Sequence, residues 1–226
     1  MENIITVENV SKYFKETVAL RHVTVAFEQG KSHGLIGRNG SGKTVLLKCL
    51  CGLMHPDEGK IIVNGQTIDE RHDIPESLGA IIEAPGFLPN YSGYRNLQFL
   101  AGINHRIRRE QIQQAMTTVG LDPQSRKHVG KYSLGMRQRL GLAQAIMENP
   151  ALLILDEPTN GLDKHGVEEL RQLLFGFKKQ GKTILLASHS AEDIGLLCDT
   201  VHEMDAGVLA EVTRPETEHE KTTKIG

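Results

Sequence analysis

Short aliphatic and β-branched runs alternate along the chain with longer segments of helical period. Glycine, asparagine or aspartate bounds most of the runs, and each run has the length of one strand. Such alternation is typical of a parallel sheet whose strands are joined by crossover helices. The pattern therefore predicts an α/β fold with strands at Ile4–Val10, Val23–Phe27, Ser32–Ile36, Lys60–Val63, Leu78–Ile82, Ala151–Leu155, Thr183–Ala187 and Thr200–Met204.

Three segments depart from this alternation. Asn64-Gly65 follows the strand ending at Val63, and this dipeptide favours the tight turn of an antiparallel hairpin. Between residues 84 and 149 the apolar positions follow helical spacing instead, as in Ile112, Ala115, Met116 and Val119. Residues 213–226 are almost wholly polar, which predicts a frayed tail.

The domain organisation follows from these segments. We expect a single domain over 1–226, with its sheet core at about 1–83 and 150–211. A helical subdomain is inserted at about 84–149, and a polar tail covers 212–226. A chain of 226 residues with 39% hydrophobic residues can bury one substantial core.

The composition argues against binding to nucleic acid, secretion and insertion into a membrane. The net charge is −2 and the chain has no lysine- or arginine-rich run, which argues against a nucleic-acid partner. The three cysteines lack paired spacing and are interpreted as reduced thiols. The N-terminus lacks the pattern of a secretory signal, and every apolar run is far shorter than the ~20 residues of a membrane span. We therefore expect a cytoplasmic protein without direct membrane insertion.

One glycine-rich segment satisfies the pattern G-x-x-x-x-G-K-[ST]. It follows the apolar strand ending at Ile36 and precedes a helical segment, the context in which such a loop binds phosphate. Backbone amides and a helix N-terminus would face the phosphates, Lys43 would add a cation, and the Thr44 hydroxyl would bind Mg²⁺. The alternative is an ordinary strand-to-helix turn, which the context disfavours. The predicted nucleotide-binding residues are Gly37, Arg38, Asn39, Gly40, Ser41, Gly42, Lys43 and Thr44.

A second chemical element is the pair of carboxylates after the aliphatic run Leu152–Leu155. A buried strand delivers Asp156 and Glu157 to the carboxyl edge of the sheet, beside the phosphate loop. Asp156 is suited to a hydrated Mg²⁺, and Glu157 to polarising an attacking water as general base. A helix cap or turn is the alternative. ATP and Mg²⁺ are thus the expected cofactors.

The segment Tyr132–Met136 resembles the signature sequence L-S-G-G-Q of the ABC transporter ATPases, with Ser133 and Gly135 in the matching places. The resemblance covers about Ile4–Glu211. It implies a P-loop NTPase (RecA-like) core, an antiparallel β subdomain and an inserted α-helical subdomain. It also implies an ATPase that drives transport through transmembrane permease subunits, on the cytoplasmic face of the cell membrane.

In that family the signature faces the nucleotide held by a second ATPase subunit. Ser133 is also a natural N-cap whose hydroxyl and nearby amides can meet a γ-phosphate. Asp163 resembles the residue of the loop that crosses between the two sites, and His189 resembles the histidine that senses the γ-phosphate. The resemblance therefore implies catalytic roles for Lys43, Glu157 and His189. The second subunit is either another copy of this chain or a related cassette.

An aromatic residue near the first hairpin is expected to stack on adenine. The family pattern places Phe14 at this position, with Tyr13 as the alternative. A core aromatic on the hairpin is the other interpretation.

Glu83 stands where the family normally has a glutamine that binds Mg²⁺. A carboxylate can also bind Mg²⁺, but it cannot donate an amide hydrogen bond. The segment 83–90 and the signature variant resemble the branch that exports bacitracin and lantibiotic peptides and confers resistance or immunity. Export of another cargo is the alternative. Phe87, Leu88 and Tyr91 lie where the membrane subunit docks in this family, or else pack internally.

Two other functions compete with transport. ABC ATPases that act on DNA or ribosomes usually have two fused cassettes, a long coiled coil or a basic arm, which this chain lacks. A small-molecule kinase or GTPase would share the phosphate loop but leave the signature, Asp163 and His189 unexplained.

Overall fold

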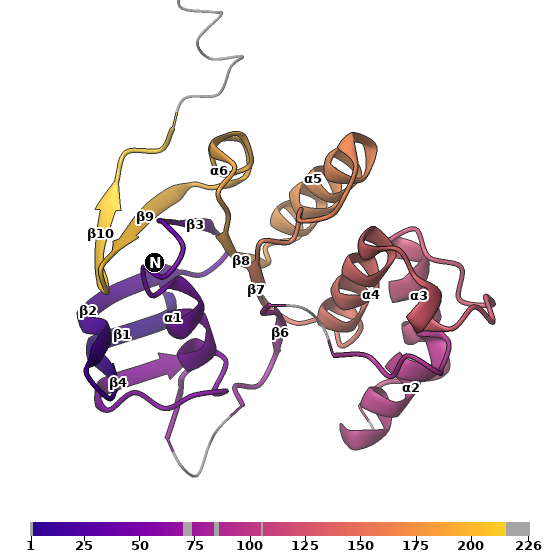
Figure 1. The fold of residues 1–226 in the computed structure, drawn as a ribbon, viewed down its shortest axis with the longest axis horizontal. Coiled ribbons are helices and arrows are strands. Elements are labelled where there is room, and N and C mark those ends of the chain that lie inside the picture. Colours follow the sequence, from indigo (N-terminus) through magenta and orange to yellow (C-terminus); the bar gives the residue numbers. More distant parts are fainter. Residues whose placement is uncertain (1, 70–73, 84–85, 105, 216–226) are drawn as a thin grey trace, which may run out of the picture.

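The computed structural model describes residues 2–69, 74–83, 86–104 and 106–215, which form two β-sheets and a group of helices (Figure 1). The first sheet is antiparallel, with strand order β2-β1-β4-β5. Its strands are β1 (Asn3–Phe14), β2 (Thr17–Glu28), β4 (Glu58–Val63) and β5 (Gln66–Thr67).

The second sheet has the order β10-β9-β3-β8-β7-β6, and its neighbouring strands run parallel except for the antiparallel pair β9–β10. Its strands are β3 (Ser32–Ile36), β6 (Leu78–Ile81), β7 (Leu152–Asp156), β8 (Thr183–Ala187), β9 (Thr200–Asp205) and β10 (Val208–Val212). The central strands β7 and β8 are fully buried, as expected of a parallel sheet covered on both faces.

Helices cover the two faces of this sheet. They are α1 (Lys43–Leu50), α2 (Gly93–Asn104), α3 (Arg109–Thr118), α4 (Leu134–Ile146), α5 (Lys164–Lys179) and α6 (Ala191–Leu197), with a short 3₁₀ turn at Val129–Lys131. In Figure 1, α2, α3 and α4 lie together on the opposite side of β6 and β7 from the antiparallel sheet. All three helices fall inside the range 84–149, and we refer to them as the helical lobe.

Two hydrophobic clusters meet at the parallel sheet because successive side chains of a strand point to opposite faces. Leu152 and Ile154 of β7 pack with α1 and the antiparallel sheet. Leu153 and Leu155 pack with α5, α6 and the helical lobe. The strand β7, which ends at Asp156, is therefore packed by a hydrophobic cluster on each face.

The helical lobe is joined tightly to the sheet through β6 and α4. A side chain at Gly79 of β6 would clash with the backbone carbonyl oxygen of Ala145 in α4, so the two backbones approach at a distance that only glycine allows. This contact fixes one side of the lobe next to the segment that begins at Glu83.

The predicted α/β class and strand positions are confirmed, with several corrections to the boundaries. Asn64 and Gly65 both have positive φ, 52° and 76°, and connect β4 to β5 as the predicted hairpin turn. The strands β1 and β2 extend well beyond their predicted ranges. β10 was missed, and Val212, assigned to the polar tail, instead ends β10 opposite Val201. Residues 216–226 of the predicted tail lie outside the described residues.

Candidate active site

The loop between β3 and α1 has a backbone that only glycine fits at two positions. Gly37 and Gly42 have φ of 144° and 113°, and a Cβ atom at either position would clash with a carbonyl oxygen, that of Met204 or Ala19. Gly42 is also the N-cap of α1 and offers no side chain to its first amides. The start of α1 therefore keeps N–H groups and the positive end of the helix dipole available to an anion.

Lys43 sits inside this loop rather than projecting into solvent. Its buried ammonium donates hydrogen bonds to the carbonyl oxygens of Gly37, at 2.5 Å, and Arg38, at 3.1 Å. Burial lowers the pKa of Lys43, and attraction from Glu157 and Asp156 opposes that shift. The cation thus closes the loop and faces the two carboxylates.

Thr44 and Asp156 bring two oxygen atoms together at the floor of the site. The Thr44 hydroxyl donates to Asp156 Oδ2 at 3.0 Å, although the two residues come from different elements, α1 and β7. A hydroxyl beside a carboxylate suits Mg²⁺, which prefers oxygen ligands and usually retains waters and substrate phosphates. Across the residues that the structure describes, no group of three His, Cys, Asp or Glu could hold a metal. A magnesium ion here would therefore need oxygen atoms from nucleotide and water.

Glu157 follows Asp156 with a left-handed backbone, φ 49°, and its amide donates to the carbonyl oxygen of Ala187 at 2.9 Å. Its Oε1 lies 3.2 Å from His189 Nε2, and the same nitrogen lies 2.9 Å from Asn39 Oδ1. Burial raises the pKa of Glu157, while His189 and Lys43 act in the opposite direction. A carboxylate with a raised pKa is better matched to accepting a proton near neutral pH.

Glu83 leaves β6 with a positive φ of 57°. Its Oε1 lies 2.8 Å from the Nζ of Lys48, one helical turn after Thr44 on α1. The residue that departs from the usual family pattern therefore has a cationic partner in this chain.

Most of these residues line one cleft of about 510 Å³, although Gly37 and Lys48 are not among its lining residues. It contains the predicted Arg38, Asn39, Gly40, Ser41, Gly42, Lys43, Thr44, Glu83, Asp156, Glu157 and His189. Its lining also includes Thr17, Val18, Ala19, Val45, Leu134, Gln138 and Asn160, which the sequence interpretation did not assign to a site. Gln138 lies two residues after the signature segment and Asn160 three residues after Glu157, so proximity in sequence was the available signal.

The two aromatic candidates differ in their surroundings. The Tyr13 amide donates to Asp57 Oδ2 and its hydroxyl to Glu58 Oε2. Phe14 has an exposed ring and lies at the β1–β2 turn, where its backbone pairs with Thr17. Thr17 is two residues before Ala19, which lines the cleft. Neither ring lines the cleft, and the Nζ of Lys12 lies 5.8 Å from the centroid of the Phe14 ring.

Ser133, Gly135 and Asp163 lie outside the lining of this cleft. Ser133 caps α4, and its hydroxyl accepts from the Met136 amide at 3.2 Å. Asp163 caps α5 by accepting from the Gly166 amide at 2.8 Å. A Cβ on Gly135 would meet the carbonyl oxygen of Gly161, so the two segments are packed side by side. Leu134 between them is 63% exposed, which marks this surface as open.

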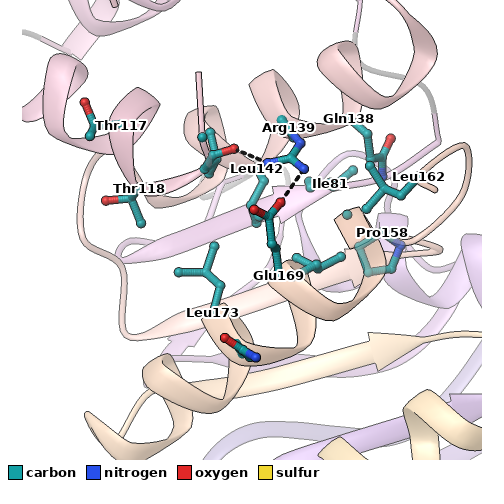
Figure 2. A pocket seen from close by; sticks show the side chains of 15 residues that line it. Ile81, Thr117, Thr118, Gln138, Arg139, Leu142, Pro158, Leu162, Glu169 and Leu173 are labelled. Atoms are coloured by element: carbon teal, nitrogen blue, oxygen red, sulfur yellow. Dashed lines mark hydrogen bonds and ion pairs between the residues drawn. The ribbon is translucent and has the colours of Figure 1, made fainter. Parts of the chain in front are cut away.

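A second pocket, of about 300 Å³, lies between the helical lobe and α5 (Figure 2). Arg139 of α4 spans it, donating to the carbonyl oxygen of Val119 at 3.0 Å and pairing with Glu169 of α5 at 2.5 Å. Leu142, Leu162 and Leu173 supply an apolar lining. This pocket has none of the phosphate-loop residues and lies at the junction between lobe and core.

The cysteines take no part in the cleft. All three are buried and free, and burial raises the pKa of their thiols to about 11 for Cys49 and about 12 for Cys51 and Cys198. A thiol with so high a pKa is a poor nucleophile.

A glycine-built loop at a helix N-terminus, a lysine inside it and two carboxylates on the neighbouring strand define a P-loop nucleoside triphosphatase. The signature segment narrows this class. A family model described as ABC transporter matches residues 20–160. The chain belongs to the ABC transporter family, as an ATP-binding subunit with the ATPase activity of that family.

Individual relatives agree with this assignment. The chain is 43% identical to the uncharacterised ABC transporter ATP-binding protein YybJ of Bacillus subtilis, over 91% of this chain and 94% of that protein. It is 39% identical to the bacitracin transport ATP-binding protein BcrA of Enterococcus faecalis, over 99% and 73%. It is 36% identical to the lantibiotic transport ATP-binding protein SrtF of Streptococcus pyogenes, over 88% and 85%.

A solved structure supports the fold. The structure of cbiO1 from Clostridium perfringens, part of the ABC transporter complex cbiONQ, matches with a TM-score of 0.83 at 27% identity, covering 100% of this chain and 95% of that one. Within the described residues, no helix has the length and apolar character needed to cross a bilayer.

Proposed function

We propose that this ATPase subunit drives an exporter of peptide antibiotics, of the bacitracin or lantibiotic class, and so confers resistance or producer immunity. The observation that carries the ATPase part is the convergence of the phosphate loop, Asp156, Glu157 and His189 on one cleft. The similarity to BcrA and SrtF supports the cargo class. Export of another cargo is the competing function.

Nucleotide binding is assigned to the phosphate loop. The amides of residues 37–44 and the Lys43 ammonium contact the β- and γ-phosphates, and the Phe14 ring stacks on adenine. Thr44, Asp156 and Glu83 would hold Mg²⁺ through oxygen atoms. When bound, Mg²⁺ neutralises charge that develops on the phosphate oxygens.

Hydrolysis is assigned to Glu157. Its carboxylate accepts the proton of the attacking water, a role that its raised pKa supports. His189 contacts both Glu157 and Asn39 of the phosphate loop, which supports a role in sensing the γ-phosphate and in orienting the carboxylate.

The working assembly is proposed to be a dimer on a membrane partner. Ser133, Gly135 and Asp163 lie outside the cleft of their own chain and would complete the site of a second ATPase subunit. Transmembrane permease subunits would hold the dimer on the cytoplasmic face of the membrane. Leu88 and Tyr91 are exposed and available to that partner, whereas Phe87 packs against the hydrophobic cluster of the lobe.

Antibiotic susceptibility tests this proposal. A host lacking the gene is rescued with wild type or Glu157→Gln and challenged with bacitracin, a lantibiotic and unrelated drugs. We expect only the wild type to restore resistance, and only to one peptide class. Unchanged susceptibility to every peptide would contradict the cargo assignment, and rescue by Glu157→Gln would contradict the role of hydrolysis.

A further inference from the structure

The ion pair between Lys48 and Glu83 joins the phosphate-loop helix to the segment that leaves β6. The two residues are 35 positions apart, and Lys48 Nζ lies 2.8 Å from Glu83 Oε1. The Lys48 side chain is 28% exposed and that of Glu83 is 61% exposed. A pair this open to solvent contributes little to folding, so its effect on the neighbouring cleft is of more interest.

Lys48 belongs to the same helix as Thr44, one of the residues assigned to Mg²⁺. Thr44 and Lys48 are four residues apart on α1 and therefore lie on one face of the helix. Thr44 contacts Asp156, and Glu83 lines the same cleft as both. The Glu83 carboxylate thus pairs with an ammonium group on the helix that carries Thr44, and it lines the cleft that holds the oxygen atoms assigned to Mg²⁺.

Lys48 itself does not line the cleft, and among the described residues no lysine of the cleft lining is paired with Glu83. Lys43, the lysine among the cleft-lining residues, has its ammonium directed to the carbonyl oxygens of Gly37 and Arg38. The cleft also carries the carboxylates of Asp156 and Glu157, whose negative charge disfavours a third unpaired carboxylate. Lys48 offsets that repulsion before a cation arrives.

We propose that Lys48 is a positioning residue that competes with Mg²⁺ for the Glu83 carboxylate. Without nucleotide, Lys48 holds Glu83 against α1. When the metal–nucleotide complex enters, Glu83 exchanges the ammonium for the metal. Glu83 lies two residues after the end of β6, so the exchange acts where the chain leaves the sheet toward the helical lobe. This inference rests on the proposed function of the cleft.

Manganese binding tests the competition without relying on ATP turnover. Free Mn²⁺ is measured by electron paramagnetic resonance while the full chain is titrated in the presence of ADP. We expect Lys48→Met to bind Mn²⁺ about two- to five-fold more tightly than wild type, the range for one exposed ion pair. Lys48→Arg, which keeps the charge, should behave as wild type.

A double-mutant comparison separates this pair from a general change in charge. In a Glu83→Gln background, Lys48→Met should leave Mn²⁺ affinity unchanged, because no carboxylate remains to be released. Lys31→Met makes the same change in net charge at the Lys31–Glu28 pair on the sheet edge and should also have no effect. Thermal unfolding of each variant confirms that it is folded.

The possible outcomes distinguish two failures. An unchanged or weakened affinity in Lys48→Met, or an equal increase in both backgrounds, would overturn the role of Lys48 while leaving the metal site standing. If the wild type with ADP retains no Mn²⁺, both the proposed metal site and this inference fail.

Discussion

The helices α1 and α4 begin in contrasting ways, although both N-termini are assigned to phosphate. At α1, Gly42 provides no side-chain cap, and the loop around Lys43 is already closed by hydrogen bonds to its own carbonyl oxygens. At α4, the hydroxyl of Ser133 accepts from the Met136 amide, so the helix caps itself. The N-terminus of α1 therefore has no side-chain cap, whereas that of α4 is capped by its own serine.

This difference separates a site built within one chain from a surface that needs a second chain. The first amides of α1 gain a partner when an anion binds. At α4 the Met136 amide already has the Ser133 hydroxyl as its partner, and the exposed Leu134 beside it lines the mouth of the cleft. In the proposed dimer, the α4 terminus exchanges its own hydroxyl contact for a phosphate brought by another subunit.

Glu157→Gln should have the largest effect because it removes the proton acceptor and leaves both helix termini intact. We expect the ATPase rate to fall about 10²- to 10⁴-fold while ATP affinity is retained. Phosphate release measures the rate, and calorimetry measures the affinity. A variant that hydrolyses at the wild-type rate would show that another group accepts the proton.

Lys43→Ala should weaken nucleotide binding at the N-terminus of α1. Loss of a charged hydrogen-bond donor to phosphate predicts about 10- to 100-fold weaker ATP binding, measured by calorimetry. The matched control is Lys31→Met, which alters a lysine of β3's flanking turn outside the cleft and should bind ATP normally. Wild-type affinity in Lys43→Ala would contradict the assignment of the loop.

Substitutions at Ser133 should show how much the N-cap of α4 contributes to stability. Serine, asparagine and aspartate are comparable N-caps, so Ser133→Asn and Ser133→Asp should both retain thermal stability, whereas Ser133→Ala should lose about 1 kcal/mol. Thermal unfolding checks this order. If Ser133→Ala unfolds at the wild-type temperature, the hydroxyl contributes no cap.

Acidic pH should destabilise the sheet beneath the phosphate loop, by an amount per histidine similar to the loss of the α4 cap. His33 of β3 contacts Thr200 and the carbonyl oxygen of Glu28, and burial lowers the pKa of His33 and of His202. The unfolded chain then binds protons that the folded chain does not, so stability is complete above pH ~6.5 and falls as pH drops toward the lowered pKa values.

The measurement for this effect is the unfolding temperature at pH 7.5 and 5.5. We expect a loss of about 2–4 °C per histidine over the first pH unit below 6.5. His33→Gln, which cannot be protonated, should reduce the difference. An equal difference in that variant would assign the acid effect to other groups.

The sequence predicted the elements whose signal is local. The phosphate loop directly follows its strand in the sequence, so the spacing of its residues was enough to predict phosphate binding. β1 and β2 were underestimated because bulges, such as those between Val7 and Val10 and between Val10 and Lys12, interrupt the two-residue alternation. β10 was missed because it is a short edge strand whose turn, Ala206-Gly207, lacks a strong hairpin motif.

The contacts that sequence could not predict join distant residues. Lys48 and Glu83 meet only because α1 and β6 are brought to the same edge of the sheet. Arg139 and Glu169 meet across the pocket between lobe and core. Neither pair has a spacing that marks it, since the partners come from different elements.

The most direct test is sedimentation of Glu157→Gln with and without ATP, alone and combined with Ser133→Asp or Ser133→Asn. We expect an ATP-dependent dimer that persists with the neutral Asn and is lost with Asp, because a negative charge then faces the γ-phosphate while the cap is retained. A dimer that is unaffected by Asp, or one that forms equally without ATP, would contradict the pairing of an open α1 with the α4 of a second subunit.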